Sequence, residues 1–343
     1  MGNCMSTSTP LKSINSNPNS ATNVKSSNQS IPTQRSDDEM LSTPGLKAFS
    51  CNDFANGIEY SQSLTEGGEY SDIVFKGWID KQTLCPSTPK TGIPVSLKHL
   101  KSEVFKGDKE WLAKLNYIGQ LHHPNLVKLI GYRVDSEDWF LVYEFLPNGS
   151  LENYFFREGI QPISWETRMK VAIGAAKGLS FLHDAESQVL YRYLDASHIL
   201  LDDDFNVKLP AYLAPQVMDI QGYARQGYVA QGYAAPESVD SVYGPGCVST
   251  KSDVYSYGIL LLVLLTGRRA LKKSMISDQY LLNWVKLFRR KLLQIMDTKL
   301  EGQYPENVAV AVAALALQCT DSNLNSRPEM SHVLEKLQEA LTL

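Results

Sequence analysis

The sequence predicts an α+β protein with a disordered N-terminal tail, a small β-rich N-terminal lobe and a larger helical C-terminal lobe. Three observations support this prediction. Residues 1–47 contain no aromatic side chain and are rich in Ser, Thr and Asn. Short apolar segments bounded by turn residues, typical of strands, lie between residues 73 and 145. From residue 165 onward, longer segments with helical apolar periodicity predominate.

The tail, residues 1–47, is predicted to be disordered because it cannot bury enough apolar surface to offset the entropy lost on ordering. Its first residues, MGNCMS, fit a myristoylation motif in which removal of Met1 exposes Gly2. One acyl chain binds membranes only marginally, so stable anchoring needs a second signal, and Cys4 is placed to receive palmitate. We therefore expect a lipid anchor at Gly2 and Cys4; an accidental match is the alternative.

The two lobes are predicted over residues 48–143 and 144–343. Strands are expected at 73–75, 95–98, 126–132 and 139–145, with one helix at 109–121. Helices are expected in the second lobe at 165–183, 253–266, 281–288, 308–319 and 330–341.

Composition excludes several classes of protein. The net charge of −4 over 343 residues gives no basic field for nucleic acid. The five cysteines are scattered and show no metal-ligand spacing, which favours a reducing compartment. The longest apolar run, 259–265, is too short to span a bilayer and is read as a buried helix.

Several segments occur in the order of protein-kinase landmarks: LHHPNLVKLIGY, LVYEFLPNGSLENYFF, GAAKGLSFLH, YRYLDASHILLD, GYAAPE and KSDVYSYGILLLVLLTGRR. From about residue 58 to the C-terminus the chain resembles plant receptor-like cytoplasmic kinases. The resemblance implies a two-lobed protein-kinase fold at the cytosolic face of the plasma membrane. It also implies partners among receptor kinases or intracellular immune receptors, and a role in plant defence signalling.

The resemblance also identifies positions where the family's catalytic groups are replaced. The catalytic loop H-R-D-L-x-x-x-N carries Tyr193 at the position of its aspartate, and a phenol with a pKa of about 10 is a poor base. Asp195 replaces a lysine that faces the phosphate, and His198 replaces the magnesium-binding asparagine. Ala211 stands where the second metal ligand belongs and has no oxygen for a hard cation. Magnesium binding is therefore not expected, no metal site is predicted, and no cofactor is required.

Nucleotide binding is left open by the sequence. Lys98 matches the strand lysine that contacts the ATP phosphates, and Gly67 and Gly68 remain of the glycine-rich loop. The usual glutamate partner of that lysine is replaced by Lys114, so Lys98 either still holds ATP or pairs with Glu110 or another carboxylate.

The residues that brace the kinase fold are retained. Glu237 matches the residue that pairs with a late arginine, here Arg327, and Asp253 matches the aspartate that supports the catalytic loop. Before Glu237 lie three Gln-Gly-Tyr units, with Tyr223, Tyr228 and Tyr233, which are either a contact surface or a tolerated loop.

Because the scaffold is kept and the catalytic groups are replaced, we predict that the chain is not an enzyme. The expected function is that of a pseudokinase acting as a membrane-tethered scaffold, decoy or regulator. Two alternatives stay open: an active serine/threonine kinase with atypical catalytic residues, or a switch that binds ATP without hydrolysing it.

Overall fold

The computed structural model describes residues 45–50, 74–101, 115–134, 138–157, 159, 161–185, 189–191, 194–211, 232–239, 249–272, 279–300 and 302–342. The described residues, from 45 onward, belong to one compact unit. The predicted disordered tail lies outside the described residues, apart from its last three. The predicted boundary between the lobes stays a prediction.

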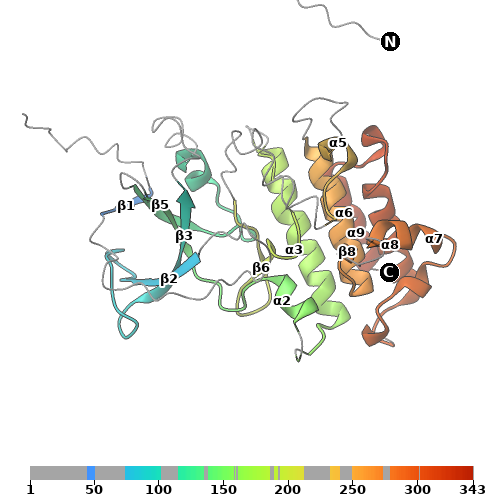
Figure 1. Ribbon diagram of the computed structural model, residues 1–343, viewed down its shortest axis with the longest axis horizontal. Helices are drawn as coiled ribbons and strands as arrows, with labels where there is room; N and C mark the ends of the chain where they lie inside the picture. The colour runs from blue at the N-terminus through green and yellow to red at the C-terminus, as the bar shows by residue number, and fades with distance from the viewer. Residues whose placement is uncertain are drawn as a thin grey trace, which may run out of the picture. The chain divides into compact units, whose positions relative to one another are not determined.

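A five-stranded sheet forms the N-terminal lobe, with strand order β1-β4-β5-β3-β2 (Figure 1). Neighbouring strands pair antiparallel, except that β1 pairs parallel with β4. The bounds are β1 (Lys47–Phe49), β2 (Val74–Ile79), β3 (Ile93–Lys101), β4 (Leu129–Val134) and β5 (Asp138–Glu144). The described part of the predicted helix at 109–121, residues 115–120, is helical.

Strand β1 was not predicted, and its pairing depends on a glycine. A Cβ at Gly131 would lie 2.1 Å from the carbonyl oxygen of Lys47, so only glycine allows the two strands to approach. Phe49 then inserts into a buried cluster with Val95 and Leu97 on one face of the sheet. Tertiary packing, rather than the local sequence pattern, therefore fixes this short strand.

The five helices predicted in the C-terminal lobe are confirmed to within three residues at each end. They are α3 (Trp165–Asp184), α6 (Thr250–Thr266), α7 (Leu281–Leu287), α8 (Glu306–Cys319) and α9 (Met330–Leu341). The short helices α2 (Leu151–Phe156) and α5 (Pro236–Val239) were not predicted. The lobe also contains two short antiparallel strand pairs: β6 (Leu200–Leu201) with β7 (Val207–Lys208), and β8 (Leu271–Lys272) with β9 (Gln279–Tyr280). Three 3-10 helices are described as well: η4 (Leu292–Ile295), η5 (Thr298–Leu300) and η6 (Leu324–Ser326). The α+β, two-lobed prediction is confirmed.

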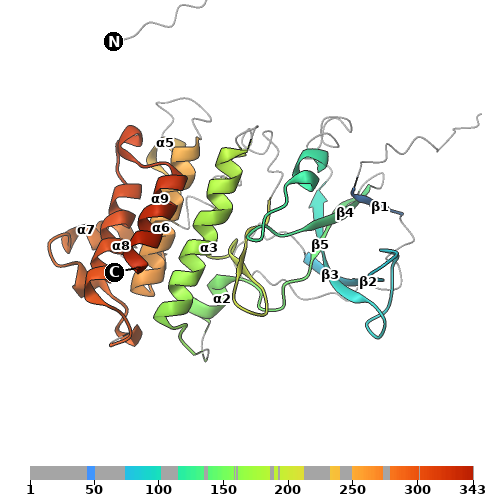
Figure 2. The same cartoon turned by 180° about the vertical axis from the view of Figure 1, so that it is seen from behind.

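Helix α6 is the centre of this lobe. It is buried from Ser252 to Thr266 and packs against α3 and α8, as both views show (Figures 1 and 2). Its start is fixed by Ser249, whose backbone N–H donates to the Ser252 hydroxyl at 3.2 Å. It ends at Gly267, whose left-handed conformation (φ 65°) closes the last turn. Within the described part of the chain, no helix combines the length and apolar character needed to cross a membrane.

Replacing Gly258 by alanine tests the contact between α6 and α8. A Cβ at Gly258 would lie 2.7 Å from the Cβ of Cys319 and 2.7 Å from the Cγ2 of Thr320. We expect Gly258→Ala to lower the free energy of unfolding by about 1–3 kcal/mol, because this buried contact cannot expand without strain. Urea unfolding measures the change.

The matched control is Val310→Ala on the outer side of α8, where the side chain is 38% exposed. This control is expected to change the free energy of unfolding by less than about 0.5 kcal/mol. Equal effects of the two substitutions would contradict the described helix contact.

Candidate active site

Lys98 lies in the centre of β3, and its side chain is buried, with 8% exposure. In the β3–β5 register Lys98 stands opposite Leu141, and cross-strand partners project from the same face of a sheet. Leu141 belongs to a buried cluster that also contains Ala211. The lysine predicted to contact phosphate and the residue at the metal-ligand position therefore share one face of the sheet.

Ala211 lies in an apolar environment. It is 5% exposed and clusters with Leu115, Ile118 and Leu141. The chain reaches this point through Leu209, which exchanges backbone hydrogen bonds of 2.8–2.9 Å with Asn125 and Val127. The methyl side chain of Ala211 has no oxygen to offer a hard cation.

The catalytic loop is organised around Asp195, which is 1% exposed. Its Oδ1 atom accepts hydrogen bonds from the Ser197 hydroxyl at 2.6 Å and from the backbone N–H groups of Ser197 and His198 at 2.8 and 3.1 Å. The Nδ1 atom of His198 lies 2.9 Å from the same oxygen. Burial opposes ionisation, but His198 and these hydrogen bonds outweigh it and lower the pKa of Asp195.

This geometry changes the role expected for Asp195. The sequence suggested a negative charge facing the phosphate, whereas the buried carboxylate accepts hydrogen bonds within its own loop, from Ser197 and His198. His198 is thereby hydrogen-bonded at the position where the family has a metal-binding asparagine. Within the described residues, no group of three or more His, Cys, Asp or Glu side chains gathers as a metal site would require.

Asp253, in the first turn of α6, supports the start of the catalytic loop. Its Oδ2 atom accepts a hydrogen bond of 2.8 Å from the backbone N–H of Tyr191 and lies 3.0 Å from Nε2 of His183. Asp253 is 1% exposed, and His183 is also buried. His183 lies in the last turn of α3 and ends the landmark GAAKGLSFLH, but its contact with Asp253 was not predicted.

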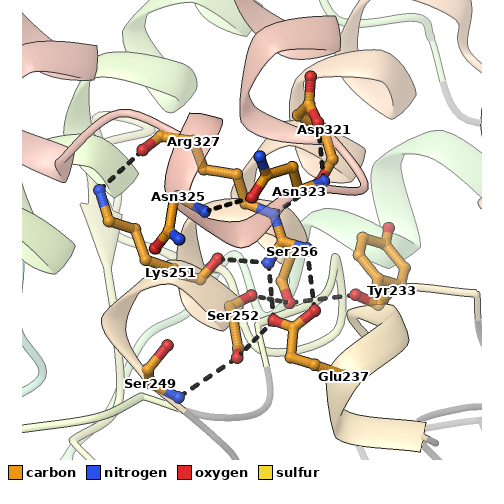
Figure 3. Close-up of polar contacts among 10 residues, drawn as sticks. All are labelled: Tyr233, Glu237, Ser249, Lys251, Ser252, Ser256, Asp321, Asn323, Asn325 and Arg327. Carbon is orange, nitrogen blue, oxygen red and sulfur yellow. Dashed lines mark hydrogen bonds and ion pairs between the residues drawn. The ribbon is translucent and has the colours of Figure 1, made fainter. Parts of the chain in front are cut away.

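Glu237, at the end of the activation segment (residues 211–237), forms a two-pronged ion pair with Arg327 (Figure 3). The guanidinium donates from Nη1 to Oε1 at 2.7 Å and from Nη2 to Oε2 at 2.9 Å, and Arg327 is 2% exposed. Ser252 of α6 donates a third hydrogen bond to Glu237 at 2.8 Å. The structure thus brings together Glu237 and Arg327, the pair suggested by the resemblance.

Tyr233, the third tyrosine of the Gln-Gly-Tyr units, is buried, with 4% exposure. Its carbonyl accepts a hydrogen bond of 3.1 Å from the Ser256 hydroxyl (Figure 3). Burial, followed by the charges of Asp195 and Glu152, raises the pKa of the Tyr233 phenol well above its usual value. This tyrosine is part of the core that joins the activation segment to the catalytic loop. It is not a surface contact or an accessible phosphorylation site.

Several predicted site residues lie outside the described residues. They are Tyr193 at the base position, Gly67 and Gly68 of the glycine-rich loop, and Gly2 and Cys4 at the acylation sites. Glu110 and Lys114, discussed as partners of the Lys98 region, and Tyr223 and Tyr228 of the first two Gln-Gly-Tyr units lie there too.

The β-rich lobe with a buried strand lysine, the loop braced by Asp253 and the Glu237–Arg327 pair together define the protein-kinase class of fold. The family model described as "Protein tyrosine and serine/threonine kinase" matches residues 58–337. The chain belongs to this kinase family, in its plant receptor-like cytoplasmic branch.

The relatives support that placement. The chain is 47% identical to "Probable serine/threonine-protein kinase PBL3" of Arabidopsis thaliana, over 99% of this chain and 86% of the relative. It is 41% identical to "Receptor-like cytoplasmic kinase 176" of Oryza sativa subsp. japonica, over 99% of this chain and 91% of the relative. Among solved structures it is similar to the pseudokinase domain of BIR2, titled an immune regulator of the RLK/Pelle family. The TM-score is 0.64 at 25% identity, and the match covers 84% of this chain and 82% of that structure.

The prediction that the chain is not an enzyme is wrong. Relatives that are 46–48% identical over at least 90% of this chain are named as serine/threonine-protein kinases. The prediction weighed a few replaced positions, including His198 and Ala211, more heavily than the kinase character of the whole domain.

Replacing Glu237 by glutamine tests the ion pair with Arg327. We expect Glu237→Gln to lower the free energy of unfolding by about 3 kcal/mol, because the Arg327 guanidinium stays buried after its charged partner is removed. The matched control is Glu339→Gln, which breaks the exposed Lys336–Glu339 pair and is expected to have no measurable effect. Urea unfolding at neutral pH compares the two variants.

The same substitution has a predicted pH dependence. Burial would raise the pKa of Glu237, but hydrogen bonds from Arg327 and Ser252 outweigh it and hold the pKa below the usual 4.5. A lowered pKa in the folded state stabilises the protein above the pKa of the unfolded state. The difference between wild type and Glu237→Gln should therefore be full above pH 4.5 and shrink as the pH falls. A constant difference down to strongly acidic pH would contradict this assignment.

Proposed function

We propose that the chain is a serine/threonine protein kinase of the receptor-like cytoplasmic branch that works with atypical catalytic groups. Its context is receptor-kinase signalling at the cytosolic face of the plasma membrane. The observation that carries the proposal is the kinase-like domain match over residues 58–337, shared with relatives named as serine/threonine kinases. The buried Lys98 at the centre of β3 supports it as the group that contacts ATP.

Phosphoryl transfer depends mainly on positioning and on neutralising charge. The Asp253–Tyr191 contact and the Glu237–Arg327 pair supply the positioning. Asp253 belongs to α6, and Ser252 of α6 donates to Glu237, so both contacts join these segments to one helix. We expect the charge of the phosphates to be neutralised less well than in the family. Ala211 offers no oxygen ligand for a metal ion, and His198 pairs with Asp195 at the position of the magnesium-binding asparagine. We therefore propose that ATP binding depends on Lys98 and that transfer is slow.

Transfer of labelled phosphate from ATP to a serine- and threonine-containing protein substrate tests the proposal. We expect slow, reproducible labelling by the purified full-length chain. Lys98→Ala should reduce it at least about tenfold, because the remaining cation at the phosphates is lost. The matched control, Lys128→Ala, removes an exposed lysine of the same lobe and should leave the rate unchanged. Parallel reactions with magnesium and with chelator measure dependence on the metal.

A restored variant shows whether the replaced positions limit the rate. Tyr193→Asp, Asp195→Lys, His198→Asn and Ala211→Asp together should raise transfer at least about 100-fold, because they return a general base and charge neutralisation. Thermal unfolding checks that the variant folds, since a carboxylate at position 211 enters an apolar cluster. Labelling that persists in Lys98→Ala would contradict the proposal. ATP binding without any transfer by wild type would also overturn it, leaving a nucleotide-binding switch.

Membrane attachment through acylated Gly2 and Cys4 is part of the proposed function. The motif MGNCMS supports it, since two acyl chains give stable attachment where one does not. Receptor kinases or intracellular immune receptors are the proposed partners, supported by the receptor-like cytoplasmic relatives and by the BIR2 title.

The attachment is tested by cell fractionation of the full-length chain in plant cells. We expect wild type in the plasma-membrane fraction, and Gly2→Ala mostly in the soluble fraction, because a single remaining acyl chain binds membranes only marginally. The matched control is Ser13→Ala, in the same tail but outside the MGNCMS motif, which should leave most of the protein at the membrane. Wild type found in the soluble fraction would contradict the proposed anchor.

A further inference from the structure

A dense group of cations surrounds an exposed leucine at the C-terminal end of α7. We call it the α7 patch, and it consists of Lys286, Leu287, Arg289, Arg290 and Lys291. The four cationic residues are exposed, and Leu287 is 81% exposed, more than any other large apolar residue described as exposed.

The charge of the α7 patch is opposite in sign to that of the whole chain. The chain carries a net charge of −4, whereas the six residues 286–291 carry four positive charges and no negative one. No Asp or Glu occurs anywhere between residues 279 and 296. The patch therefore creates a local positive field that attracts an anionic partner.

The helix that carries the patch is fixed to the lobe by its opposite side. Leu281, Leu282 and Val285 are buried. The guanidinium of Arg268 lies 4.1 Å from the centre of the Trp284 ring, and the Trp284 and Phe288 rings lie 5.1 Å apart. These contacts hold α7 in place without using Leu287, so this leucine contributes little to the core.

The patch lies far from the candidate active site. In both views α7 is at the end of the helical lobe opposite the sheet, with α3 and α6 between them (Figures 1 and 2). A partner that covers α7 therefore does not cover the sheet that carries Lys98.

We propose that the α7 patch binds a membrane surface rich in anionic phospholipid. The lysines and arginines attract the lipid phosphates and carboxylates, and Leu287 enters the boundary between headgroups and acyl chains. A bilayer can bury a protruding leucine without a complementary pocket, whereas acidic side chains alone offer no apolar surface to cover it. The inference goes beyond the proposed function, in which only the acylated tail reaches the membrane.

Vesicle binding by the unacylated full-length chain tests this inference apart from the tail and from catalysis. The probes are vesicles of phosphatidylcholine and vesicles with added phosphatidylserine. We expect at least about tenfold stronger binding to the second kind, weakening as salt is raised. Lys286→Glu with Arg290→Glu should reduce this binding at least about tenfold, and Leu287→Ser should reduce it several-fold.

The matched control is Lys81→Glu with Lys90→Glu, which changes the net charge equally at exposed positions between β2 and β3. It should bind within about twofold of wild type. Equal losses in the control and patch variants, or no preference of wild type for phosphatidylserine, would overturn the inference. Binding to a polyglutamate peptide without binding to anionic vesicles would assign the patch to an acidic protein and would also overturn it. Thermal unfolding confirms that each variant is folded.

Discussion

The first two turns of α6 hold the carboxylate of Asp253, which is 1% exposed and accepts the backbone N–H of Tyr191. A negative charge is favourable at the N-terminus of a helix, and His183 supplies a second contact. The same turns provide the Ser252 hydroxyl to Glu237 and the Ser256 hydroxyl to the Tyr233 carbonyl. The catalytic loop and the end of the activation segment therefore take their positions from one buried helix.

Around this fixed frame, the polar groups beside the cleft are used differently from the family pattern. Asp195 is held in its own loop by Ser197 and His198, and Ala211 packs among apolar side chains of the N-terminal lobe. The frame keeps the geometry of a kinase, and it belongs to a family whose relatives are named as kinases. The slow transfer that we propose follows from the preserved kinase fold combined with the replaced groups at positions 195, 198 and 211.

Much of the fold was predictable because its signals are local. The apolar period of α3, α6, α8 and α9 fixed these helices to within three residues, and the order of landmarks identified the two lobes. The site was predictable where a residue matches a landmark, as at Lys98, Asp253 and the Glu237–Arg327 pair. Strand β1 was not predictable, since it exists only because Gly131 lets a distant segment approach.

The sequence by itself determined the kinase architecture and the identity of the groups beside the cleft, because residue types and their spacing are written in the chain. Only the tertiary structure decided what those groups do. It turned Asp195 toward His198, buried Tyr233 and Ala211, and left Leu287 exposed among cations. The physical reason is that hydrogen-bond partners, burial and local fields depend on neighbours brought together by folding, and spacing along the chain does not specify those neighbours.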